Sequence, residues 1–391
     1  MTAGFWRFAG LLLAILPAIA CTTPLRDFRP GEAPPEDTAE AGYWMVSDKA
    51  ERRLKTSGRL VDAPALDSYV NDIACDLTPA HCDSIRVYVV RQADFNATMM
   101  ANGVMSIWSG LLLRATNEAQ LATVIGHEIA HFTRRHTWAR MQDLRATTNA
   151  ALMFKVAVAM AGVPSAQSLV NLIAQGHIMD YSRDQEREAD HQGFEMMVEA
   201  GYRAAEAPAI WRGLIAEREA GALERPPLFF ASHPPSEERM ATLDDLAARR
   251  GDYGSGKAHK VRYLQQILPH RGDWLRDELA LRRWDRARVL LNRLQDQGAR
   301  RGELFYYRGE LHRRRDEPGD REKAVAAYKK GLAQDSGAPG QIHRSLGLVR
   351  WSQNQPGKAR AAFQRYLEAV PNAQDRDMIE SYVDRLSGEM S

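Results

Sequence analysis

The chain of 391 residues has little net charge and few cysteines, and after residue 20 it lacks a long hydrophobic run. A formal net charge of +2 argues against dedicated nucleic-acid binding, and no recognition motif for nucleic acid occurs. Because no long hydrophobic run follows residue 20, the sequence contains no convincing membrane span beyond the N-terminus. A hydrophobic content of 45% with 26% charged residues excludes a disordered chain, and the length indicates two folded domains.

The N-terminus has the pattern of an export signal. Arg7 precedes an apolar run at 8–20, which is too short to span a bilayer and ends in small residues. The residues Ala-Ile-Ala before Cys21 fit an ordinary signal-peptidase site. They also resemble a bacterial lipobox, although a lipobox usually has Leu three residues before the cysteine. We expect a signal peptide at 1–20 and lipidation of Cys21, which would tether the protein to a membrane.

A proline-rich segment and a cysteine pair follow. Residues 21–42 contain few large apolar side chains, which predicts an extended tether before the compact body. Cys75 and Cys82 are close enough to form a disulfide in an oxidising compartment, which leaves Cys21 odd and favours its lipidation. The alternative for the pair is two buried free thiols.

The segment 124–132 contains the order His127-Glu128-x-x-His131. Histidines four residues apart lie about one helical turn apart, so both imidazoles can reach one point. A zinc ion there would lie close to Glu128, which can take a proton from a zinc-bound water. Apolar neighbours make this a core helix with polar groups directed inward, which favours a zinc hydrolase over two satisfied core histidines beside a surface glutamate.

A hairpin is predicted just before this helix. Apolar runs at 95–100 and 104–108 flank Asn102-Gly103, a strong turn signal. Asn117, with glutamine three residues later, predicts the start of the zinc helix. A strand beside a zinc helix can offer its edge to an extended peptide, and an ordinary packed hairpin fits equally well.

A third zinc ligand is expected from the segment 181–191. Glu186 and Asp190 are four residues apart and share a helical face, while Glu188 points to the far side. One carboxylate can bind zinc while the other accepts a hydrogen bond from the outer nitrogen of a zinc-bound histidine. Without the zinc motif these residues would be interpreted as a solvated charged face.

Three motifs in order resemble one family of zinc peptidases. The zinc-helix motif is followed by Ser-Arg-x-x-Glu-x-Glu-Ala-Asp at 182–190 and by Ser-His-Pro at 232–234 with Arg239. Over roughly residues 60 to 250 the chain resembles the gluzincin peptidases that include the HtpX membrane proteases, the CAAX prenyl proteases and the periplasmic BepA-like enzymes. It departs from the membrane members, because its apolar stretch 150–161 is short and contains Lys155, which predicts a buried or lid helix.

The resemblance implies a role for each motif residue and one zinc ion per chain. It makes Glu186 the third zinc ligand, Asp190 the outer partner of a ligand, and Glu128 the general base. It puts His233 and Arg239 at the rim of the active site, where Arg239 would orient Glu186. His233 would either stabilise the oxyanion or cap the zinc in a latent state.

The C-terminal third has the spacing of tetratricopeptide repeats. Ala287, Ala324 and Ala359 recur about 37 and 35 residues apart, close to the expected repeat of about 34. Such helix pairs stack into a solenoid whose concave surface binds peptides or partner proteins, and a plain helical bundle is the alternative. We predict an α+β, mainly α protein, with a zinc metalloprotease domain and small sheet at 43–250, a hinge at 251–258 and an α-solenoid at 259–391.

This combination resembles the BepA-like proteins. It implies a zinc-dependent endopeptidase of the bacterial periplasm, tethered to the outer membrane as a lipoprotein, that degrades misfolded or misassembled envelope proteins. Outer-membrane assembly machinery is the implied partner, and no nucleic acid is expected. The alternative is an assembly chaperone or scaffold for outer-membrane proteins in which proteolysis is secondary. Intact ligands and base at His127, Glu128, His131 and Glu186 favour the enzyme.

Overall fold

The structure is a computed structural model that describes residues 30–147, 181–221, 229, 233, 237–250, 254–334 and 337–388. The predicted export signal, Cys21 and the predicted lid helix at 150–161 lie outside these residues. Among the described residues, none of the helices has the length and apolarity needed to cross a membrane.

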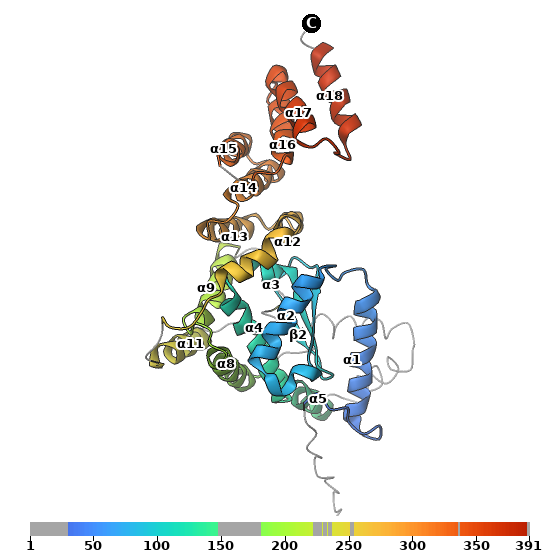
Figure 1. The fold of residues 1–391 in the computed structure, drawn as a ribbon, viewed down its shortest axis with the longest axis vertical. Coiled ribbons are helices and arrows are strands. Elements are labelled where there is room, and N and C mark those ends of the chain that lie inside the picture. Colours follow the sequence, from blue (N-terminus) through green and yellow to red (C-terminus); the bar gives the residue numbers. More distant parts are fainter. Residues whose placement is uncertain are drawn as a thin grey trace, which may run out of the picture.

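The described chain is mainly helical with one small sheet, as predicted (Figure 1). Its elements in the N-terminal and central part are α1 (Ala39–Thr56), α2 (Pro64–Leu77), the 3-10 helix η1 (Pro79–Ser84), β1 (Arg86–Val90), β2 (Ala97–Met99), β3 (Val104–Trp108), α3 (Ser109–Arg114), α4 (Glu118–Thr133), α5 (His136–Thr147), α8 (Arg183–Glu199), α9 (Glu206–Ala220) and α11 (Glu237–Arg249). The C-terminal helices are α12 (Lys260–Ala280), α13 (Trp284–Asp296), α14 (Arg301–Arg315), α15 (Asp320–Leu332), α16 (Gln341–Ser352), α17 (Pro356–Ala369) and α18 (Arg376–Gly388).

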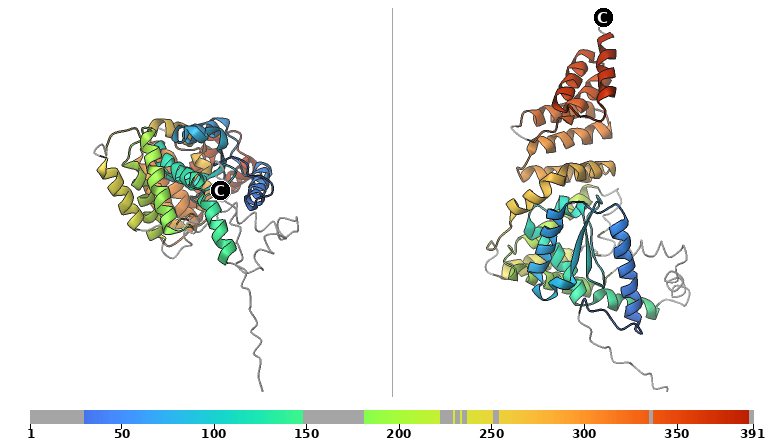
Figure 2. Two further views of the ribbon diagram at one scale, coloured as in Figure 1. Left: turned by 90° about the horizontal axis from the view of Figure 1, so that it is seen from below. Right: turned by 45° about the vertical axis from the view of Figure 1, so that its right-hand side comes forward.

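The sheet has the strand order β1-β3-β2, with β1 parallel and β2 antiparallel to β3. The predicted hairpin is therefore confirmed. Its turn needs glycine at position 103, where φ is +80° and a Cβ would lie 1.9 Å from the carbonyl oxygen of Ser84. Alternate strand residues face α1 on one side and α2 with α4 on the other, so the sheet lies between helices (Figures 1 and 2).

Two N-terminal features define the ends of elements. The first helix, α1, begins at Ala39, because the side chain of Thr38 accepts a hydrogen bond from the backbone N–H of Ala41 and caps the helix there. The disulfide between Cys75 and Cys82 is present and joins the end of α2 to η1.

The C-terminal helices are joined to the central part through a continuous core. Tyr263, Trp274 and Leu291 belong to the same buried cluster as residues of α2, β1 and α4. The carbonyl oxygen of Ala258 accepts hydrogen bonds from the backbone N–H groups of Glu118 and of the residue after it, at the start of α4. The entry into α12 is thus bound directly to the helix that carries the zinc motif.

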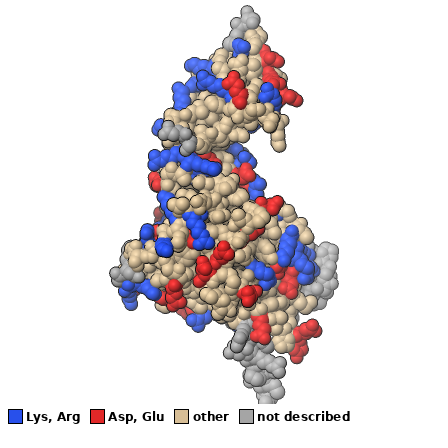
Figure 3. All heavy atoms as spheres, viewed as in Figure 1, with Lys and Arg blue, Asp and Glu red and all other residues tan. Residues whose placement is uncertain are grey.

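The later helices stack as antiparallel pairs that extend away from the sheet (Figure 2). A Cβ at Gly309 would lie 2.2 Å from the ring of Tyr328, and one at Gly347 would lie 2.5 Å from the ring of Phe363. Equivalent glycine–aromatic contacts in α14/α15 and α16/α17 fit a repeat solenoid. On the face drawn in Figure 3, basic and acidic side chains are interspersed over both parts of the molecule.

Candidate metal centre

Helix α4 directs polar groups into the core, as its sequence predicts. Asn117 caps it by accepting a hydrogen bond from the backbone N–H of Gln120, and nearly every residue of the helix is buried. Two glycines then allow α8 to lie against it. A Cβ at Gly193 would lie 2.6 Å from the backbone nitrogen of His127, and one at Gly126 would lie 2.9 Å from the carbonyl oxygen of Gly193. This close approach brings the carboxylates of α8 beside the histidines of α4.

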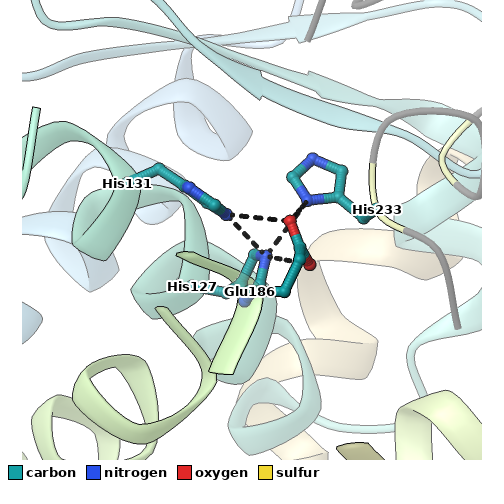
Figure 4. Close-up of side chains that lie close together, drawn as sticks. All are labelled: His127, His131, Glu186 and His233. Carbon is teal, nitrogen blue, oxygen red and sulfur yellow. Dashed lines mark hydrogen bonds and ion pairs between the residues drawn. The ribbon is translucent and has the colours of Figure 1, made fainter. Parts of the chain in front are cut away.

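Four side chains meet in one cluster, namely His127, His131, Glu186 and His233 (Figure 4). Nε2 of His127 lies 3.1 Å from Nε2 of His131 and 3.2 Å from Nδ1 of His233. Oε1 of Glu186 lies 3.4 Å from Nε2 of His131 and 2.8 Å from Nδ1 of His233. Ligand atoms held about 2.0–2.1 Å from a tetrahedral zinc ion lie roughly 3.3 Å from one another, so this donor set fits zinc.

The electrostatics of the cluster also fit a divalent cation. Burial lowers the pKa of His131 well below its usual value, which favours the neutral ring that a metal ligand needs. Burial alone would raise the pKa of Glu186, but the nearby His233 and His131 outweigh it and hold that pKa well below its usual range. Glu186 is therefore an ionised carboxylate, the form in which it can bind a metal ion.

Glu128 lies beside the cluster and is 2% exposed. Burial raises the pKa of its carboxyl, although the nearby His233 and His127 oppose the shift. Among the described residues its Oε1 atom has no hydrogen-bond partner, and it lies 3.6 Å from Nε2 of His233. A desolvated carboxylate with a free oxygen and a raised pKa is suited to accept a proton.

Asp190 and Arg239 lie behind the cluster. Oδ1 of Asp190 lies 3.0 Å from Nδ1 of His127, on the side of the ring away from the other donors. Arg239 donates to both oxygens of Asp190, at 2.6 and 2.7 Å, and its Nη1 atom lies 2.5 Å from Oε2 of Glu186. The structure thus brings all the predicted site residues together.

His131 makes two contacts that its sequence context did not predict. The ring of Tyr181 stacks on it at a centroid distance of 3.9 Å, and Nδ1 of His136 lies 2.9 Å from its Nδ1 atom. Glu188, expected to point away, lies 3.2 Å from Nε2 of His136. A histidine five residues after His131 is not a helical neighbour, so spacing gave no signal for it.

Comparison with known proteins supports a peptidase. The profile described as Peptidase family M48 matches residues 61–247. The chain is 27% identical over 222 residues to the beta-barrel assembly-enhancing protease of Escherichia coli (strain K12), covering 54% of this chain and 45% of that protein. A putative protein of the same name from Vibrio cholerae is 27% identical over 251 residues, covering 60% of this chain and 51% of the relative. The chain spans about half the length of these two relatives.

This chain covers a larger share of the length of a third relative. The metalloprotease YcaL of Escherichia coli (strain K12) is 34% identical over 207 residues, covering 52% of this chain and 74% of that protein. Residues 61–247, which the family profile matches, contain α4, α8 and the buried donor cluster. M48 metalloproteases use zinc, which the four donors are able to bind. Sequence similarity and site geometry agree that the chain belongs to peptidase family M48.

Proposed function

We propose that the chain is a zinc-dependent endopeptidase of the bacterial cell envelope. The observation that carries this proposal is the buried cluster of His127, His131, Glu186 and His233, whose donor spacing fits a tetrahedral zinc ion, with Glu128 beside it. His127, His131 and Glu186 are the proposed permanent ligands.

The protein's own residues then divide the work of peptide hydrolysis. A bound zinc ion would polarise the scissile carbonyl and lower the pKa of a water molecule. Glu128 would accept a proton from the attacking water and pass it to the leaving amine. Asp190 holds the ring of His127, and Arg239 holds both Asp190 and Glu186 in place.

The sheet offers a place for an extended substrate. β2 is an edge strand of the sheet and packs against α4. A cavity next to it is lined by Met100, His131, Phe132 and Trp138, together with other residues of this surface. We propose that a substrate strand pairs with the edge of β2 and inserts a side chain into this cavity, so that its backbone crosses the metal centre.

His233 is proposed to plug the metal site when no substrate is bound. Its Nδ1 atom lies as close to Nε2 of His127 as the other donors do, so it is placed to act as a fourth ligand. His233→Ala should then raise background cleavage of casein and self-cleavage. If His233 instead stabilises the oxyanion, the same variant should lose turnover. Wild-type rates in both assays would remove the residue from the mechanism.

The location and clients are proposed from the sequence and the relatives. The export pattern and Cys21 support a lipoprotein tethered to the outer membrane, and two relatives are named for β-barrel assembly. We propose that the enzyme degrades misfolded or misassembled envelope proteins. The stacked C-terminal helices would be tetratricopeptide repeats that bind clients or the outer-membrane assembly machinery.

The direct test is cleavage of an unfolded protein by the purified chain. Wild type should cleave reduced casein, and a chelator should abolish the activity. Glu128→Gln should keep its zinc but lose activity by at least about 100-fold, because the proton acceptor is gone while the ligands remain. Rates come from fluorescent casein, and zinc content from elemental analysis.

A matched control is Glu195→Gln, which changes a partly exposed carboxylate of α8 that pairs with Arg250 away from the centre. It should keep full activity. Full activity in Glu128→Gln would contradict the mechanism. Binding of casein without zinc-dependent cleavage in wild type would favour the alternative function of a chaperone or scaffold.

A further inference from the structure

The two histidines of α4 are held from behind by different groups. Nδ1 of His127 faces the carboxylate of Asp190 at 3.0 Å, and both side chains are 2% exposed. Nδ1 of His131 faces a third histidine, His136, at 2.9 Å. His136 is buried, and its other ring nitrogen, Nε2, lies 3.2 Å from Oε2 of Glu188, whose side chain is 45% exposed.

The chemistry of these groups determines where the protons lie. An ionised carboxylate only accepts hydrogen bonds, so Nε2 of His136 must carry the proton that Glu188 accepts. A neutral imidazole has a single N–H group, and Nδ1 of His136 is therefore an acceptor. That acceptor requires the N–H group of His131 to be on Nδ1. The lone pair of His131 is then left on Nε2, the atom that faces the donor cluster.

We propose that Glu188 and His136 are positioning residues that fix the tautomer and the ring orientation of His131 as a metal ligand. This proposal rests on the proposed function in one respect, the assignment of His131 as a zinc ligand. The ring is held on its edge by His136 and on its face by the stacked Tyr181, so rotation about its side-chain bonds is restricted. Outer partners of this kind raise metal affinity by presenting a ligand that is already oriented.

The two outer partners differ in their access to solvent. Asp190 is buried and paired with Arg239, so the partner of His127 is enclosed. Glu188 lies at the surface, where it pairs with the exposed Arg134 at 3.2 Å. The chain Glu188–His136–His131 therefore connects the metal centre to the surface of α8. Its outermost residue can be changed without opening the core.

Zinc affinity of the metal-free protein, measured by competition with a chromophoric chelator, tests the proposal. His136→Ala should weaken zinc binding by about 10- to 100-fold. His136→Asn should recover most of this loss, because its Oδ1 atom stands where Nδ1 of the ring was and still accepts from His131. Glu188→Ala should weaken binding by a smaller factor. The matched control Glu195→Ala, which removes another partly exposed glutamate of α8, should bind zinc like wild type.

A spectroscopic measurement separates positioning from general damage to the fold. In metal-free protein with ¹⁵N-labelled histidine, NMR should show His131 protonated on Nδ1 in wild type and in His136→Asn. His136→Ala should show a mixture of tautomers. A merely structural role for His136 would lower thermal stability and leave the tautomer and the zinc affinity of the folded protein unchanged.

Two results would overturn the proposal. One is zinc affinity within about twofold of wild type in His136→Ala, with an unaltered tautomer of His131. If His136→Ala fails to fold, Glu188→Ala decides, and an unchanged affinity and tautomer there would overturn it equally. No substrate is needed in either assay. A protein that binds zinc as expected but cleaves nothing would refute the proposed endopeptidase and leave this inference standing.

Discussion

The metal centre and the junction between α3, α9, α12 and α13 are both buried clusters of charged side chains, but their charges balance differently. At the junction, Arg114 lies 2.7 Å from Glu217 and 3.0 Å from Glu278, and Arg293 lies 3.4 Å from Glu217. The positive charges of these two arginines balance the negative charges of the two glutamates. At the metal centre, the carboxylates of Glu128, Glu186 and Asp190 face one guanidinium among the described residues, that of Arg239.

This difference separates a structural cluster from a binding site. Burying a charge is costly unless an opposite charge accompanies it. The junction supplies its own counter-charges, so it is complete within the chain. With neutral histidines the metal centre carries an excess of two negative charges, which a divalent cation would neutralise. The comparison predicts that the two clusters respond in opposite ways to mutation and to zinc.

The largest effect is expected at the junction. Arg114→Met should lower the free energy of unfolding by about 3–5 kcal/mol, because Glu217 and Glu278 would remain buried without their main partner. Chemical denaturation measures this change. The control is Arg91→Met, which removes a more exposed ion pair with Asp277 of α12 and should cost no more than about 1 kcal/mol. Equal losses in the two variants would contradict the structural role of the balanced cluster.

A smaller effect is expected from zinc at the metal centre. Zinc at 100 times its dissociation constant should raise the free energy of unfolding of wild type by about 2.7 kcal/mol. Glu186→Gln should lose this gain, because a ligand charge is removed. Without metal, Glu128→Gln should be within about 1 kcal/mol of wild type, because burial raises the pKa of Glu128 and the variant removes one of the surplus negative charges.

Denaturation curves with zinc and with chelator provide this measurement. Arg114→Met serves as the reciprocal control, because it should be destabilised by the same amount in both conditions. A metal-free Glu128→Gln protein that is several kcal/mol less stable than wild type would show that the centre, like the junction, is balanced without a cation.

Much of the site follows from local sequence. Helical spacing alone puts His127 and His131 on one side of α4, and it puts Glu186 and Asp190 on one face of α8. The roles of His233 and Arg239 came from family resemblance, because a loop histidine and a single arginine have no local signature. The structure brings them to the same centre.

Other features depend on how distant segments pack. His136 follows a reversal of the chain at Arg135, where φ is +56°, and that turn returns it to His131. The junction joins residues 114, 217, 278 and 293, which share no motif and lie on four different helices. Neither hydrophobic periodicity nor motif spacing contains such contacts, so the sequence alone did not predict them.

The carbonyl oxygen of Ala258, which accepts from the first N–H groups of α4, has a consequence for exchanging parts of this protein between relatives. A graft made at 251–258 would divide one core and leave the start of α4 without its acceptor. The helices from α15 onward contribute to two smaller buried clusters, separate from this core. Lineages that lengthen, shorten or replace the solenoid would preserve the peptidase only if the crossover point lay beyond α14, the last helix that contributes to the large core.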